Sequence, residues 1–115
     1  MSAVEPISLF YWGIRARNYA PVVIAQAGGL PLKQETGFDL GAMKPELPFG
    51  QVPCLKQGDA LVVQSGAVIR YVARKAGLQG DTDADFGKSE YLIEEMQDIT
   101  TLLKYRTSLS AYLTL

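Results

Sequence analysis

The apolar positions of the chain form four short runs that are separated by polar residues, glycine and proline. The first run, residues 7–12, is rich in β-branched and aromatic side chains and predicts a buried strand. The glutamine, glycine and aspartate at 57–59 are typical of a hairpin turn between two strands. The other three runs predict further strands, at residues 32–36, 52–56 and 60–63.

Two segments between these runs carry apolar residues at helical spacing. Residues 65–76 predict the clearest helix, in which Ser65 is placed to cap the first turn and Gly77 to end the last. An earlier helix is expected over residues 18–27, with the glycine pair at 28–29 as its stop. The apolar face of the clearer helix consists of Val68, Ile69, Val72, Ala73 and Ala76.

A further long helix is predicted to begin at Lys88, after a polar and acidic segment that we interpret as a linker. Its apolar residues repeat at intervals of 4, 3 and 4, which is typical of a heptad-like packing seam. The seam consists of Leu92, Met96, Ile99 and Leu103, with Ile93 beside it.

The order of these elements favours an α/β fold with a mixed sheet. It matches a thioredoxin-like βαβ-ββα domain, followed by one or two helices of an incomplete all-α domain. The expected boundaries are residues 1–80 for the first domain, 81–86 for the linker and 87–115 for the start of the helical domain.

Composition restricts the chemistry that the chain can perform. The 115 residues include no histidine, which excludes Ser-His-Asp and Cys-His nucleophile pairs and histidine metal ligands. The one cysteine, Cys54, cannot form an internal disulfide or a thiolate zinc cluster, so no metal is expected. A single thiol fits a reduced, cytoplasmic setting.

Charge and hydropathy argue against two classes of partner. The formal net charge of −1 gives no footprint for binding nucleic acid phosphates. No apolar stretch approaches the roughly 20 residues that span a bilayer, so no membrane span is expected.

Four short motifs follow one another along the chain. They are an apolar-aromatic strand end with an Arg-Ala-Arg at 9–17, a Gly-Gln-Val-Pro turn at 50–53, a Gln-Ser pair at 64–65 and an Ile-Arg-Tyr-Val-Ala-Arg segment at 69–74. Together they resemble the N-terminal domain of the cytosolic glutathione transferases of the tyrosine type, which include the sigma, pi and mu classes.

The resemblance implies that glutathione is the co-substrate and that Tyr11 is the catalytic residue. A free thiol has a pKa of about 8.5, so a hydroxyl that donates a hydrogen bond to the sulfur favours the thiolate near neutral pH. The alternative is a core or interface tyrosine with a satisfied hydroxyl.

The resemblance also implies how the peptide is held. A cis bond between Val52 and Pro53, with Gln51 before it, would present a strand-like edge to the cysteine backbone of glutathione. Gln64 and Ser65 would bind the γ-glutamyl carboxylate, because a helix N-terminus favours negative charge. The alternatives are an ordinary trans proline and a serine that acts only as a cap.

Three more residues are implied by the family pattern. Lys44 would pair with the glycyl carboxylate, although Leu40 stands where many family members have a tryptophan. Arg17 is the second arginine of its motif, and Asp98 resembles an aspartate that reaches the γ-glutamyl amine in a neighbouring subunit. The alternatives are a solvated charge for Lys44 and an ion pair for Arg17.

These observations predict a glutathione transferase that attacks a small electrophile. Residues 88–115 are expected to be covered by a second copy, by another subunit or by further residues of the same protein, so a homodimer or a partner subunit is expected. The alternative is a non-catalytic interaction or structural subunit of a larger assembly. A thiol–disulfide oxidoreductase is disfavoured, because the first strand ends at Tyr11 and not at a cysteine.

Overall fold

The computed structural model describes the backbone of residues 5–113 and the side chains of residues 5–102. Its four strands form one mixed sheet in the order β2-β1-β3-β4. The strands are β1 (Ile7–Phe10), β2 (Lys33–Glu35), β3 (Cys54–Gln57) and β4 (Ala60–Val63). The helices are α1 (Tyr19–Ala27), α2 (Leu40–Met43), α3 (Ser65–Lys75) and α4 (Asp83–Leu113), with a 3₁₀ turn at Lys44–Glu46.

The strand pairing follows from the connections between the strands. Helix α1 carries the chain from β1 to its parallel neighbour β2, whereas β1 pairs with β3, and β3 with β4, in antiparallel fashion. A tight turn at Gly58, with φ of 56°, closes the predicted hairpin. The sequence prediction of a thioredoxin-like βαβ-ββα order is confirmed.

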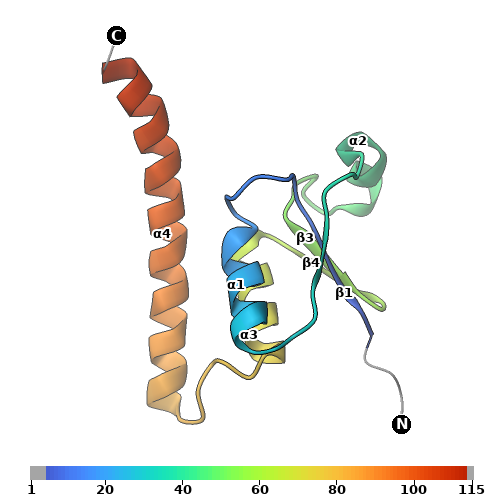
Figure 1. Cartoon of the computed structure of the whole chain (residues 1–115), viewed down its shortest axis with the longest axis vertical. Coiled ribbons are helices and arrows are strands. Elements are labelled where there is room, and N and C mark those ends of the chain that lie inside the picture. Colours follow the sequence, from blue (N-terminus) through green and yellow to red (C-terminus); the bar gives the residue numbers. More distant parts are fainter. Residues whose placement is uncertain (1–4, 114–115) are drawn as a thin grey trace.

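The core lies between the sheet and the two helices α1 and α3, which run side by side on one face of the sheet (Figure 1). Ile7 and Leu9 alternate along β1 and both point into this core, as the strand period of two requires. The remaining members of the core cluster are Ala25, Leu55, Val68 and Val72. Four residues of the apolar face predicted for α3 are buried as expected, whereas the fifth, Ala76, is half-buried and follows the end of the helix.

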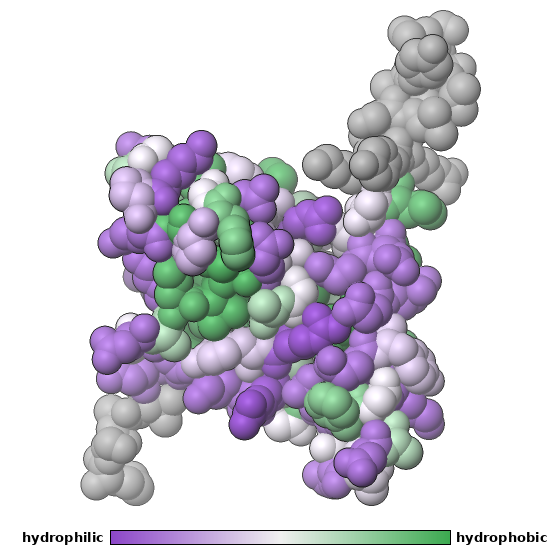
Figure 2. All heavy atoms as spheres, turned by 180° about the vertical axis from the view of Figure 1, so that it is seen from behind, coloured by the Kyte–Doolittle hydropathy of each residue, from purple (hydrophilic) through white to green (hydrophobic). Residues whose placement is uncertain are grey.

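The other face of the sheet carries aromatic residues. The ring centroids of Phe10 and Phe38 lie 6.2 Å apart in an edge-to-face arrangement. The view from behind in Figure 2 shows apolar side chains gathered in one patch on this side of the molecule, with mostly hydrophilic surface around it.

Helix α4 begins at Asp83, and the prediction that it begins at Lys88 is wrong by five residues (88 − 83). The hydroxyl of Thr82 accepts a hydrogen bond from the backbone N–H of Asp85, which caps the helix. The carboxylates of Asp83 and Asp85 lie in the first turn, where the helix dipole favours them. The acidic segment interpreted as a linker thus supplies the start of the helix.

The packing face of α4 also differs from the predicted seam. Ile93 is buried and Met96 is half-buried, whereas Leu92 and Ile99 are 57% and 48% exposed. The described part of α4 packs mainly against α3, and its contacting face carries polar groups such as Glu90. The seam residue Leu103 lies outside the described side chains.

Among the described residues, no helix combines the length and the hydropathy needed to cross a bilayer. Within the same part of the chain, cysteine and acidic side chains form no group that could hold a metal ion.

Candidate functional site

The end of β1, the loop before β3 and the start of α3 surround a cavity of about 530 Å³, which α4 borders on one side. All of the predicted site residues except Lys44 and Asp98 line it. The lining consists of Tyr11, Trp12, Arg17, Leu40, Gly50, Gln51, Val52, Pro53, Gln64, Ser65 and Gln97. Residues more than 80 positions apart in the sequence thus meet at one place.

Tyr11 follows β1 directly and is fixed at the edge of the cavity. Its backbone N–H donates to the carbonyl of Glu35 at 3.3 Å, which continues the pairing of β1 with β2. The Tyr11 side chain is 8% exposed, and its ring centroid lies 5.3 Å from that of Trp12. The ring is therefore held by packing on the protein side while the residue still lines the cavity.

The Val52–Pro53 peptide bond is cis, as predicted from the resemblance. Pro53 is buried, Val52 is half-buried and both line the cavity. The bend immediately precedes β3 and is thereby anchored to the sheet.

The start of α3 differs from the prediction in one respect. Ser65 is the first residue of the helix and not its cap, and the side chain of the capping residue Gln64 makes no capping hydrogen bond. The Ser65 hydroxyl instead accepts a hydrogen bond from the side-chain amide of Gln97 at 2.8 Å. Among the described side chains, none bonds to the first-turn N–H groups of α3 beside the cavity, and such groups suit an anion.

Gln64 precedes this helix in an unusual conformation. Its φ is 75°, in the left-handed region that favours glycine. In this conformation the Gln64 side-chain amide donates to the side-chain carbonyl of Gln51 at 3.2 Å. The two glutamines therefore link the proline bend to the start of α3.

Lys44, Arg17 and Asp98 are placed differently from one another. Arg17 lines the cavity. Lys44 is exposed, and its side chain lies beside Gly50: a Cβ built on Gly50 would be 3.9 Å from the Lys44 Cε. Because Gly50 lines the cavity, this places Lys44 at its rim. Asp98 is exposed on α4 and does not line the cavity of its own chain. Its role across a subunit boundary stays a prediction.

Trp12, Leu40, Gly50 and Gln97 also line the cavity, and sequence reasoning did not choose them as site residues. Leu40 occupies the position where the family pattern has a tryptophan. Gln97 had no signal in the sequence, because the predicted seam placed a different face of α4 against the domain. Its neighbour Met96 was assigned to that seam.

Cys54 lies in β3 with no exposed surface, and burial raises the pKa of its thiol above the usual value. Because the thiolate is the reactive form, we expect Cys54 in the folded protein to react much more slowly with a disulfide reagent than a free thiol does. Following the reaction by absorbance, without and with denaturant, tests this. Equal rates under both conditions would contradict the buried placement.

The fold is thioredoxin-like, and its cavity lies where the end of β1, the cis-proline bend and the start of α3 meet. No protein-family model matches the chain. The glutathione S-transferase P of Caenorhabditis elegans is 45% identical over 65 residues, which cover 56% of this chain and 30% of the relative. The hematopoietic prostaglandin D synthase of Gallus gallus is 31% identical over 102 residues, or 84% and 50% of the two chains.

A solved structure is similar to this chain in its fold as well. The glutathione S-transferase of Ascaris lumbricoides superposes with a TM-score of 0.76 at 27% identity, over 93% of this chain and 54% of the other. In both sequence and structure, the chain is therefore similar to the first half of glutathione S-transferases. It spans 30% to 50% of the length of these two curated relatives.

Proposed function

We propose that this chain binds glutathione in the cavity and stabilises its thiolate for attack on a small electrophile. The observation that carries the proposal is that one cavity brings together a tyrosine at a strand end, a cis-proline bend and an uncapped helix start. Glutathione is an extended peptide with a thiol in the middle and carboxylates at both ends. Each of the three features suits a different part of it.

The start of α3 would hold the γ-glutamyl carboxylate. The first-turn N–H groups and the Ser65 hydroxyl can donate hydrogen bonds there, and the helix dipole adds favourable electrostatics. The side chain of Gln64 would contribute a further amide. Lys44, beside the lining residue Gly50, would pair with the glycyl carboxylate, and Arg17 would add positive charge to the same cavity.

The cysteine of glutathione would lie between these ends. The strand-like edge at Val52, with Gln51 before it, would pair with the cysteine backbone and so direct the sulfur toward Tyr11. The Tyr11 hydroxyl would donate to the sulfur and favour the thiolate, whose proton goes to solvent. On attack, the sulfur forms a bond to the electrophilic carbon and the leaving group departs with its electron pair.

Calorimetric titration of the full chain with glutathione, followed by an assay with glutathione and an aryl halide, tests this proposal. We expect saturable binding and turnover above the uncatalysed rate. No glutathione binding would remove the proposed site and leave the fold alone. The single thiol and the family both fit the cytoplasm as the location of this reaction.

A homodimer is the assembly that we propose. Helix α4 exposes several large apolar side chains, Tyr91, Leu92, Ile99 and Leu102, which are 48% to 70% exposed. Such a surface is typical of an interface. A second copy would cover it and could bring Asp98 to the amine of glutathione in the neighbouring cavity.

Light scattering tests the assembly. We expect a mass of about twice the 12.5 kDa of one chain, and a shift toward the single-chain mass in Ile99→Glu. The matched control is Leu61→Glu on β4, which also charges an exposed leucine but should leave the mass unchanged. A single-chain mass for the parent protein at all concentrations would exclude the homodimer.

A non-catalytic interaction subunit is the second candidate, and the same exposed face of α4 favours it. Glutathione binding without turnover of any electrophile would support this function. Turnover that is lost in a Tyr11 variant would support the enzyme.

A further inference from the structure

Gln97 reaches the candidate site from α4 of the same chain. Its side-chain amide donates to the Ser65 hydroxyl oxygen at 2.8 Å, and both residues line the cavity. A hydroxyl has one hydrogen to donate and two positions at which it accepts. Gln97 occupies an accepting position and no described group accepts from Ser65, so the hydroxyl hydrogen can be donated to a ligand.

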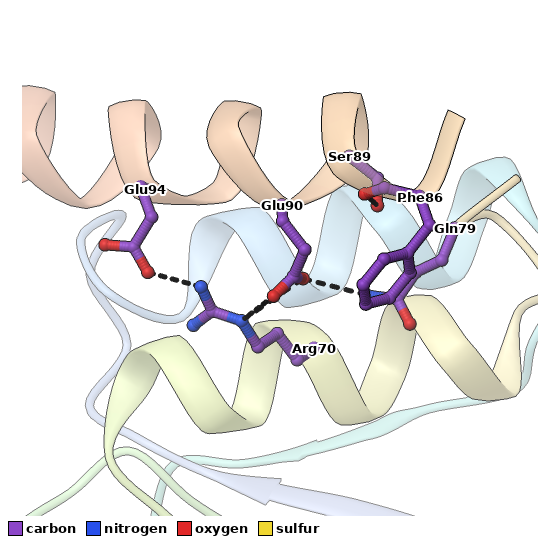
Figure 3. Close-up of polar contacts among 6 residues, drawn as sticks. All are labelled: Arg70, Gln79, Phe86, Ser89, Glu90 and Glu94. Carbon is purple, nitrogen blue, oxygen red and sulfur yellow. Dashed lines mark hydrogen bonds and ion pairs between the residues drawn. The ribbon is translucent and has the colours of Figure 1, made fainter. Parts of the chain in front are cut away.

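An ion-pair cluster holds α4 in register with α3 (Figure 3). The Arg70 Nε on α3 lies 2.9 Å from a carboxylate oxygen of Glu90 on α4, and the Arg70 Nη2 contacts the carboxylate of Glu94. The side-chain amide of Gln79 donates to the other Glu90 oxygen at 3.1 Å. The hydrogen bonds that Arg70 donates to Glu94 and Glu90 raise the pKa of its guanidinium, because they favour the charged form.

The spacing along α4 connects this cluster to Gln97. Residues three or four apart on a helix share a face, so Glu90, Glu94 and Gln97 all point toward α3. A Cβ built on Gly66 would lie 3.1 Å from the Arg70 Nη1 and 3.4 Å from the Gln97 Nε2. The missing side chain at Gly66 therefore leaves room for both groups beside the start of α3.

We infer that Gln97 is a positioning residue that acts through Ser65, directing its hydroxyl hydrogen toward the γ-glutamyl carboxylate of bound glutathione. The inference rests on the proposed glutathione site. It assigns to α4 a role in the cavity of its own chain, in addition to any role across a subunit boundary. Loss of the Gln97 amide should weaken binding of that carboxylate and of nothing else.

Calorimetric titration of the full-length variants with glutathione tests this role. Gln97→Met keeps the length of the side chain and removes the donor, and we expect glutathione affinity to fall roughly 3- to 10-fold. Gln97→Glu should weaken binding further, because the new carboxylate accepts the Ser65 hydrogen and repels the ligand carboxylate. Glu95→Ala, on an exposed position of the same helix, is the matched control and should bind as the parent does.

Two further measurements separate positioning from a structural effect. In a cycle with Ser65→Ala, the double variant should bind no more weakly than Ser65→Ala alone, because Gln97 acts only through that hydroxyl. The probe 4-aminobutyryl-cysteinylglycine is glutathione without the γ-glutamyl α-carboxylate, and the parent and Gln97→Met should bind it equally. Thermal unfolding confirms that each variant is folded.

Unchanged glutathione affinity in Gln97→Met would overturn the inference and leave the proposed function intact. The inference would also be overturned if Gln97→Met weakened glutathione binding further in the presence of Ser65→Ala. It would likewise be overturned if Gln97→Met lost as much affinity for the probe without the carboxylate as for glutathione. If the parent protein does not bind glutathione, the proposed function and this inference both fail.

Discussion

Replacement of Tyr11 with phenylalanine is expected to lower kcat for conjugation of glutathione to an aryl halide about 100-fold, the typical cost of losing one preorganised donor to a developing or stabilised anion. The substitution removes a hydroxyl and nothing else. The Tyr11 ring is 8% exposed and packs on Trp12, so a phenylalanine ring can occupy the same place. The fold and the affinity for glutathione should therefore change little.

The pKa of the bound glutathione thiol tests directly whether the Tyr11 hydroxyl stabilises the thiolate. Ultraviolet absorbance of the bound thiolate, titrated against pH, should show the apparent pKa of the glutathione thiol moving up in Tyr11→Phe toward the free value of about 8.5. Turnover of the variant should recover in part as the pH rises, since solvent then generates the thiolate.

Tyr71→Phe is the matched control for Tyr11. Its hydroxyl donates to the side chain of Gln57 and lies outside the cavity lining, so the loss of that hydroxyl should leave kcat unchanged. Full turnover in Tyr11→Phe, or an equal loss in both variants, would show that the Tyr11 hydroxyl does not act on the sulfur.

The second large effect is expected at Gly28, where α1 ends against the end of α3. A Cβ on Gly28 would lie 2.5 Å from the Ala76 Cβ and 3.0 Å from the Ala76 carbonyl oxygen. The backbone at Gly28 has an ordinary φ of −91°, so the close approach and not the conformation requires glycine. Gly28→Ala should lower the free energy of unfolding by about 1 to 3 kcal/mol, the usual cost of overpacking.

Urea denaturation measures this effect. Gly37→Ala is the matched control, because a Cβ there meets no atom within 4 Å, and its stability should stay close to that of the parent. In the double variant with Ala76→Gly, the loss should be smaller than the sum of the two single losses, since the worst contact is gone. A fully stable Gly28→Ala protein would show that α1 and α3 do not approach so closely.

The glycine pair Gly28 and Gly29 shows how far the sequence predicts local structure. A glycine pair after a helix predicts a stop, and α1 does end at Ala27. The sequence does not distinguish the two roles within the pair. Gly29, with φ of 66°, takes the left-handed conformation, whereas Gly28 is constrained by a neighbour almost fifty residues away. Local signals locate the element, and contacts between distant segments decide the function of each residue.

The residues of the candidate site also fall into two groups, those that local motifs predict and those that depend on contacts between distant segments. Tyr11, the bend at Val52 and Pro53, and the pair Gln64 and Ser65 could be selected because each motif is short and local. Gln97 could not, because its place depends on how α4 docks on α3, and the apolar spacing of α4 predicts a different face. Arg70 fixes that docking through Glu90 and Glu94, and a search for apolar spacing does not register polar contacts of this kind.

The conformation of Gln64 has a consequence for how this chain can change. A residue other than glycine at a backbone φ of 75° lowers the stability of the fold by on the order of 1 kcal/mol or more, a conformational cost that glycine would avoid. Selection for higher thermal stability would therefore favour glycine at position 64, and that substitution would remove the side-chain amide that bonds to Gln51. Gln64→Gly is therefore expected to remove a conformational cost and the Gln64–Gln51 hydrogen bond in a single substitution.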